Sequence, residues 1–240
     1  MTNKPRTLPR PKPYNPLAKK NLGASVAEAL LEQGAQPLGQ LSPFLGAGIY
    51  AIYYTGRFSP YRLIAERNRG DKFGWPIYVG KAVPPGARKA LASNEETQAL
   101  FGRLTEHKES IELARNLDIQ DFFARYLVVD DIWIPLGESL LIAASSPLWN
   151  RHLDGFGNHD PGRGRYSGMR PRWDVVHPGR AWAEKCAQRP EAEAVIISEI
   201  ENYLRGAPVP PERMRLLGQS PARLMEADIR SDERDDDEND

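Results

Sequence analysis

Arg103 and His107 stand four residues apart in a segment with helical periodicity, and Glu138 lies near the start of a later apolar segment. Residues at positions i and i+4 share one face of a helix, so the first two side chains would point in the same direction. A guanidinium donates two hydrogen bonds to a phosphate at once, and an imidazole accepts or relays a proton near neutral pH. A glutamate can bind Mg²⁺, which fills its remaining positions with water and phosphate oxygens. Each residue alone is more often a solvated surface group or a charge at a helix terminus, so further motifs must decide.

The segment AGIYAIYYTG, residues 47–56, places tyrosines on both faces of an alternating pattern that is typical of a β-strand. A strand that is apolar on both faces is usually central, and valine or leucine would pack there without needing a hydrogen-bond partner. Aromatic packing with hydroxyls at the rim of the core is one interpretation, and chemistry at Tyr50 is the other. A free phenol has a pKa near ~10, so only about one in a thousand is ionised at pH 7. Tyr50 would therefore need a neighbour that takes its proton.

Strands and helices that could position these residues follow from the apolar patterns. Alternating apolar residues predict strands at 48–54, 77–81 and 121–129. Helical spacing and end signals predict helices at 25–34, 97–116, 134–145 and 191–206, the first capped by Ser25. The order of elements favours an α/β (α+β) domain with a small mixed or antiparallel three-stranded sheet flanked by helices.

The chain divides into an arm, one domain and a tail. Residues 1–20 are rich in proline and lysine and are expected to form an extended basic arm. Residues 21–206 are expected to form a single domain, and residues 207–240 a proline-rich, then acidic tail without fixed structure. The 32 basic and 32 acidic residues give a formal net charge of zero. Because the tail is acidic, the rest of the chain has a net positive charge, which suits a polyanionic partner.

Composition excludes several classes of protein. The single cysteine, Cys186, rules out an intramolecular disulfide and a cysteine-based zinc site. No apolar run reaches the ~20 residues of a membrane span, and the first residues lack the apolar segment of a signal peptide. A cytoplasmic protein without a membrane partner is therefore expected. Four polar residues of the poorly patterned segment 147–185 match no common metal-ligand spacing, namely His152, His159, Asp160 and His177.

Two tripeptides stand on neighbouring predicted strands, GIY at residues 48–50 and YVG at residues 78–80. Either tripeptide alone carries little information. The residues that follow them in order are Arg103, His107, Glu138 and Asn150. Over about residues 46–182 the chain resembles the GIY-YIG nuclease superfamily, with Val79 at the usual isoleucine position. The histidine, the long segment between the tripeptides and the region WNRHLDGFGNHDPG are similar to its type II restriction endonuclease branch, in particular to the enzymes that cut CCGCGG.

The resemblance implies a nuclease core with insertions and a catalytic role for six residues. These residues are Tyr50, Tyr78, Arg103, His107, Glu138 and Asn150. Tyr50 would activate the attacking water as a general base or through a hydrogen bond, with His107 or Lys81 as the neighbour that takes its proton or favours the phenolate. Glu138 would bind Mg²⁺, with Mn²⁺ able to replace it, and Arg103 would bind the scissile phosphate.

The remaining motif residues have more open roles. Tyr78 would orient the water or bind phosphate, and Gly80 would let the DNA backbone come close because it has no side chain. Asn150 would hold the region of Glu138 in register, touch the substrate or cap a turn.

The resemblance also implies a partner, double-stranded DNA, and two DNA-recognition insertions at residues 57–75 and 151–182. Arginine is the commonest reader of guanine in the major groove, but it also binds phosphates without reading sequence. The residues expected to contact DNA are Lys81, Arg163, Arg165, Arg170 and Arg172. A palindromic site favours a homodimer in which each subunit cuts one strand, and a companion methyltransferase would protect the same site in the bacterial host.

Two alternatives remain open at this point. A homing, transposon or repair endonuclease could use the same catalytic core, although such enzymes usually add a separate DNA-binding module and none is visible here. A catalytically silent nucleic-acid-binding protein on the same scaffold is the second alternative, and a binder would have no need of the carboxylate at position 138.

Overall fold

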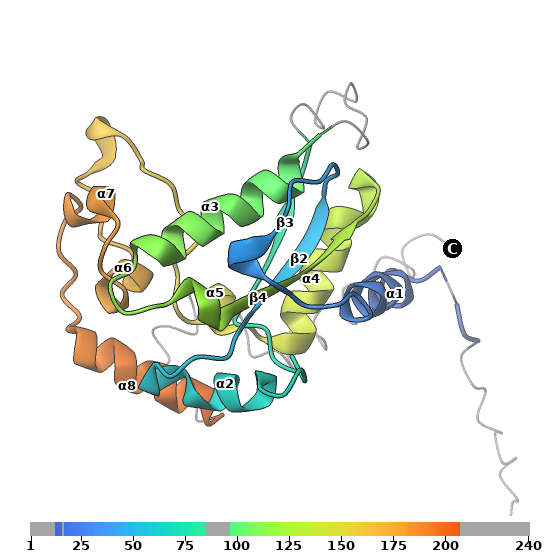
Figure 1. The fold of residues 1–240 in the computed structure, drawn as a ribbon, viewed down its shortest axis with the longest axis horizontal. Coiled ribbons are helices and arrows are strands. Elements are labelled where there is room, and N and C mark those ends of the chain that lie inside the picture. Colours follow the sequence, from blue (N-terminus) through green and yellow to red (C-terminus); the bar gives the residue numbers. More distant parts are fainter. Residues whose placement is uncertain (1–12, 16, 85–96, 207–240) are drawn as a thin grey trace, which may run out of the picture.

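The computed structural model describes residues 13–15, 17–84 and 97–206, which form an α/β fold around one antiparallel sheet (Figure 1). The strands lie in the order β1-β4-β2-β3. They are β1 (Gln36–Pro37), β2 (Gly48–Tyr54), β3 (Tyr78–Ala82) and β4 (Phe122–Val128). The described helices are α1 (Lys19–Leu31), α2 (Arg62–Asn68), α3 (Ala99–Leu113), α4 (Ile134–Ser145), α5 (Leu148–Arg151), α6 (Arg172–Val176), α7 (Ala181–Glu184) and α8 (Glu193–Leu204).

Helices cover both faces of the sheet, which is why β2 is apolar on both sides. On one face β2 packs with residues of α1 and α4 through Ile49, Ala51 and Tyr53. On the other face it packs with α3, α5, α6 and α8 through Tyr50, Ile52 and Tyr54. In Figure 1, α3 and α4 accordingly lie on opposite sides of the sheet. None of the helices described in these ranges is long and apolar enough to cross a membrane.

The predicted fold class is confirmed, with differences in detail. The two-residue strand β1 pairs with β4 and adds a fourth strand that was too short to be recognised. Helix α1 begins at Lys19, so Ser25 lies inside the helix and does not cap it. Helix α2 lies within the segment that was expected to be a long connection. Apart from residues 13–15 and 17–20, the predicted arm and the tail at 207–240 lie outside the described residues.

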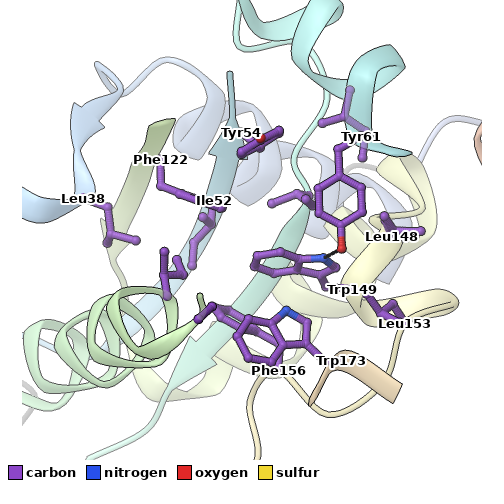
Figure 2. Close-up of a cluster of buried hydrophobic side chains, with 14 of the residues drawn as sticks. Leu38, Ile52, Tyr54, Tyr61, Phe122, Leu148, Trp149, Leu153, Phe156 and Trp173 are labelled. Carbon is purple, nitrogen blue, oxygen red and sulfur yellow. Dashed lines mark hydrogen bonds between the residues drawn. The ribbon is translucent and has the colours of Figure 1, made fainter. Parts of the chain in front are cut away.

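Residues 151–182, expected as a DNA-recognition insertion, supply part of the main core. The core residues from this segment are Leu153, Phe156, Trp173 and Val176. Figure 2 shows Phe156 and Trp173 packed beside Trp149, below the residues of β2 and β4. The same segment therefore both completes the core and carries loops toward the face of the sheet that holds Tyr50.

A buried hydrogen-bond network ties this core to α2 and α6. The Asn116 amide donates to the carbonyl of Val176, so its oxygen accepts the proton of His177 Nδ1. His177 Nε2 is then the acceptor for the hydroxyl of Tyr61, which in turn accepts a hydrogen bond from Trp149 Nε1 at 3.1 Å (Figure 2). Because every donor has an acceptor only when His177 is neutral, the network excludes the imidazolium.

Acidification from pH 7.5 to pH 5 is expected to destabilise the fold through His177. Burial, and then the positive charge of Arg180, lower the pKa of His177 to about 3. The unfolded chain takes up the proton near pH ~6.5 and the folded chain only near pH 3, so stability is lost as the pH falls through this window. At pH 5 the loss from this residue is about 2 kcal/mol. Urea unfolding at both pH values measures it.

The variant His177→Gln serves as the reference for that measurement. Glutamine offers a polar amide in place of the imidazole but does not titrate. The difference in unfolding free energy between the two pH values should therefore be smaller in the variant. Burial also lowers the pKa of His107, and that contribution remains in both proteins. An equal acid effect in the variant and the parent would show that His177 does not carry it.

Candidate active site

Tyr50 and His107 form a direct pair beneath the rest of the candidate site. The Tyr50 hydroxyl lies 2.6 Å from His107 Nε2, and both side chains are buried. Tyr50 comes from the central strand β2, and His107 comes from the third turn of α3, which packs over that face of the sheet. Of the two candidates for the Tyr50 proton, His107 is therefore in place, whereas Lys81 is bound elsewhere.

Tyr78 lies beside this pair on the edge strand β3. Its ring is 5.1 Å from the imidazole of His107 and 6.2 Å from the ring of Tyr50. Gly80 is the direct partner of Tyr50 across the two strands. A Cβ atom at Gly80 would lie 2.3 Å from the Tyr50 hydroxyl oxygen, so the ring of Tyr50 fills the space that a side chain would need. The expectation that this space admits the DNA backbone does not fit this packing.

Arg103 connects the phenols to the loop that follows α5. One of its terminal nitrogens donates to the carbonyl of Gly157 at 3.0 Å. The other lies 2.7 Å from the Glu106 carboxylate and 2.6 Å from His159 Nε2. Burial raises the pKa of both Tyr50 and Tyr78, and the charge and hydrogen bonds of Arg103 oppose this rise. Arg103 and His107 both lie in α3, four residues apart, as the spacing predicted.

Glu138 and Lys81 form an ion pair at the same edge of the sheet. The two charged atoms lie 2.6 Å apart, with 18% of the Glu138 side chain and 38% of the Lys81 side chain exposed. Glu138 lies in the second turn of α4, which packs against β3. Its charge contributes to raising the pKa of Tyr50 and of Tyr78, so the carboxylate is electrostatically coupled to both phenols.

Burial keeps the Tyr50–His107 pair neutral. It raises the pKa of the Tyr50 phenol well above 10, and Tyr78 and Glu138 raise it further against the opposing effect of Arg103. Burial lowers the pKa of His107 well below 6.5, and the positive charges of Arg103 and Arg180 act in the same direction. At pH 7 the hydrogen bond therefore joins two neutral groups, because a buried phenolate or imidazolium would lose its hydration. Additional positive charge near the phenol would be needed to favour its ionised form.

Asn150 holds the edge strand in place. Its side-chain oxygen accepts from Val79 N at 2.8 Å, and its side-chain nitrogen donates to the carbonyl of Val79 at 2.7 Å. The preceding residue adds a backbone hydrogen bond, from Trp149 N to the carbonyl of Ile77. Val79 lies between Tyr78 and Gly80, so the two bonds of Asn150 fix the backbone of β3 next to Tyr78. The structure thus places Asn150 in a positioning role.

Two contacts of the site come from residues that the sequence did not single out. The ring of Phe156 stacks on the imidazole of His107 with centroids 4.6 Å apart and lies 5.0 Å from the ring of Tyr78. The carbonyl of Gly157 binds Arg103, and a Cβ at this glycine would lie 2.9 Å from the Tyr78 hydroxyl. The region WNRHLDGFGNHDPG contains both residues, but only the fold shows that they cover the phenols.

The arginines expected to contact DNA have different environments. Arg172 is 1% exposed and binds the Glu199 carboxylate and the carbonyl of His152. The expectation that Arg172 contacts DNA does not fit this burial, because its guanidinium is used inside the fold. Arg170 binds the carbonyls of Ala183 and Glu184 and is only partly accessible.

Two arginines of this group lie in a short turn away from those internal contacts. Arg165 is exposed in the 3₁₀ turn η7 (Arg163–Arg165). The side chain of Arg163 lies outside the described part of the structure. Lys81 is partly exposed but is paired with Glu138. Arg165 and Lys81 therefore keep the most accessible positions among the expected DNA contacts with described side chains.

The polar residues that might suggest another metal site are dispersed. His177 is buried in the network with Tyr61, and His159 binds Arg103 at the surface. Asp160 accepts hydrogen bonds from the hydroxyl of Tyr166 and from Gly162 N. Among the residues described, no group of three or more histidine, cysteine, aspartate or glutamate side chains could hold a metal ion.

A comparison with protein families explains this arrangement. The family model described as the Eco29kI GIY-YIG domain matches residues 42–204, more than half of the chain. The chain belongs to this family. No curated protein matched the chain. The match includes all six residues of the predicted catalytic set and the whole sheet except β1.

Membership of the Eco29kI GIY-YIG family confirms the resemblance recognised from the two tripeptides. The chain is a DNA nuclease of the restriction endonuclease type, and DNA is its substrate. In this GIY-YIG domain the described residues bring Tyr50, Tyr78, Arg103 and His107 together on one side of the edge strand, with Glu138 coupled to both phenols.

Proposed function

We propose that this chain is a type II restriction endonuclease that hydrolyses one phosphodiester in each strand of DNA at a specific GC-rich palindrome. The resemblance favours CCGCGG as that palindrome. The observation that carries the proposal is the convergence of a phenol, an imidazole, a guanidinium and a carboxylate around the edge strand β3. These groups supply the three things that phosphodiester hydrolysis needs: a proton acceptor for water, charge stabilisation and support for the departing oxygen.

The Tyr50–His107 hydrogen bond gives the proton of the attacking water a route. As water approaches the phosphorus, its proton passes to the Tyr50 oxygen while the Tyr50 proton passes to His107 Nε2, 2.6 Å away. The resulting hydroxide forms the new P–O bond, and the bond to the leaving oxygen breaks with its electron pair on that oxygen, which then takes up a proton from solvent water. Arg103 would bind the phosphoryl oxygens as negative charge grows on them, since its charge persists at any working pH. Tyr78, partly buried beside this pair, would orient the water.

The donor set fits a divalent cation at Glu138. A partly exposed carboxylate already has a cationic group at 2.6 Å, the Lys81 ammonium, so a positive charge is accommodated there. Mg²⁺ binds well to a single carboxylate when water and phosphate oxygens complete its shell, and Mn²⁺ accepts the same ligands. When bound, the ion would lower the pKa of a coordinated water and neutralise charge on the phosphate. Lys81 would then be available to contact the DNA backbone.

A symmetric duplex site favours a homodimer with one active site on each strand. Arg163, Arg165 and Lys81 are the proposed DNA contacts, and Arg170 would join them if its internal bonds open. A companion methyltransferase acting on the same palindrome would protect the DNA of a bacterial host. A homing, transposon or repair role is the alternative, and the match to the family model of a restriction endonuclease favours the restriction role.

Digestion of a sequenced plasmid tests the proposal. With Mg²⁺ the protein is expected to give discrete fragments whose mapped ends share one palindrome, and Mn²⁺ should also support cleavage. A chelator added before the metal should leave the plasmid intact, which serves as the control. A smear in Mg²⁺ would favour a nuclease without site specificity, and an intact plasmid under all metal conditions would favour a silent binding protein.

A further inference from the structure

Arg180 anchors the loop that covers the active site, although it lies far from the catalytic residues in sequence. Its side chain is 2% exposed. Its guanidinium donates to three carbonyls of the loop, at 2.8 Å to Gly155, 3.0 Å to Phe156 and 3.1 Å to Asn158. The three acceptors are nearly consecutive, so one rigid planar group defines the path of the loop.

Asp174 fixes the orientation of that guanidinium. Its two carboxylate oxygens accept from Arg180 Nε at 2.7 Å and from a terminal nitrogen at 2.6 Å. An arginine has five N–H donors, and the two bonds to Asp174 with the three to the loop use all five. Trp173 and Trp182 lie with their rings 4.6 Å and 4.8 Å from the guanidinium carbon, which excludes water from the anchor.

The anchored loop holds two catalytic candidates directly. The carbonyl of Gly157, between two carbonyls bound to Arg180, accepts from Arg103 at 3.0 Å. The ring of Phe156 stacks on His107 at 4.6 Å with an interplanar angle of 16°. The backbone of the loop thus orients the guanidinium that would bind phosphate, and a side chain of the loop orients the imidazole that would accept the proton.

We propose that Arg180, oriented by Asp174, is a positioning residue for cleavage that acts through the loop at 155–158 on Arg103 and His107. This inference rests on the proposed endonuclease function. A lysine at position 180 keeps the charge but offers three donors from one point, so it cannot hold three carbonyls and both oxygens of Asp174 together. The loop would then be free to shift by about 1 Å, which displaces Arg103 and the stacked imidazole.

The test measures single-turnover cleavage of a duplex that carries the mapped site. At saturating protein, Arg180→Lys is expected to lower the rate constant by about 100-fold, the effect of a misplacement near 1 Å. The affinity for the same duplex, measured with Ca²⁺ in place of Mg²⁺, should change by less than about threefold, because the residues at the DNA surface are untouched. A partly unfolded population would lower the amplitude of cleavage but not its rate constant, so the rate constant reports position.

Arg172→Lys is the matched control. Arg172 is also a buried arginine that binds a carboxylate, on Glu199, and a backbone carbonyl, that of His152, but it makes no bond to the loop at 155–158. Arg172→Lys should lower the midpoint of thermal unfolding about as much as Arg180→Lys does. It should leave the rate constant for cleavage within about threefold of the parent. Equal rate constants for Arg180→Lys and Arg172→Lys would overturn the inference.

Asp174→Asn gives a second, milder variant in case Arg180→Lys does not fold. It retains one acceptor for Arg180 and is expected to slow the rate constant by about tenfold with affinity unchanged. A parental rate constant in folded Asp174→Asn would also overturn the inference. Absence of cleavage by the parent protein would remove the proposed function itself, and with it this role of Arg180. Cleavage by the parent with no selective effect of Arg180→Lys would remove only the role of Arg180.

Discussion

Tyr50→Phe is expected to slow DNA cleavage by about 10³-fold, within the range measured for loss of a general acid–base group. The substitution removes only the hydroxyl that lies 2.6 Å from His107 Nε2, while the ring that fills the space above Gly80 remains. The fold should survive, since one hydrogen bond between neutral groups contributes about 1 kcal/mol. The rate constant for single-turnover cleavage and the midpoint of thermal unfolding measure the two effects separately.

Tyr53→Phe is the matched control for this experiment. Tyr53 lies three residues further along the same strand, is equally buried and points to the opposite face, where its hydroxyl accepts from Arg125 at 3.1 Å. Loss of that hydroxyl should cost similar stability and leave cleavage near the parental rate. Parental cleavage by Tyr50→Phe would return Tyr50 to a role in packing alone.

Glu138→Ala is expected to abolish metal-dependent cleavage, with a loss of at least about 10³-fold. The carboxylate is the proposed ligand of the cation, and among the described residues it belongs to no cluster of three or more potential metal ligands. Binding of the specific duplex should stay within about threefold of the parent, because Lys81 loses its partner and gains freedom to contact phosphate. Electrophoretic mobility shifts in Ca²⁺ measure binding, and plasmid cleavage in Mg²⁺ measures activity.

The surface residue Glu112 provides the comparison for Glu138. Glu112→Gln removes a carboxylate that pairs with Lys108 one helical turn away on α3. Exposed pairs of this kind contribute little, so both cleavage and binding should remain parental. Unchanged cleavage by Glu138→Ala would remove the metal assignment, whereas a joint loss of cleavage and duplex binding would show that Glu138 supports the DNA surface instead.

The elements with clean periodic patterns could be predicted from the sequence. Strand β2 and helix α4 have the predicted bounds, because both are bounded by glycine, proline or serine signals next to apolar runs. Helix α2 was missed because three of its seven residues carry charged side chains, and its apolar face became visible only against β2. The two residues of β1 are too few for any period to be detected.

The candidate site divides in the same way. The resemblance to the GIY-YIG superfamily, carried by the two tripeptides and the order of the residues after them, implied the six motif residues. It did not show that Asn150 binds the backbone of Val79, since an amide can bind either a backbone or a substrate. Residue type misled most at Arg172, because a buried arginine and one that binds DNA look the same in a sequence. No local sequence pattern marks Arg180, because its five hydrogen-bond acceptor atoms belong to two separate segments, residues 155–158 and Asp174.

The contact between Gly80 and the ring of Tyr50 bears on how substitutions are tolerated across related chains. The glycine of one tripeptide and the tyrosine of the other occupy a single volume, so any larger residue at position 80 would push the phenol off His107 before it met DNA. A related chain with a larger residue at position 80 can stay folded if a smaller residue replaces Tyr50, but it then lacks the Tyr50 hydroxyl. Substitutions at positions 50 and 80 should therefore occur together, and an alanine at position 80 would indicate a related chain without nuclease activity.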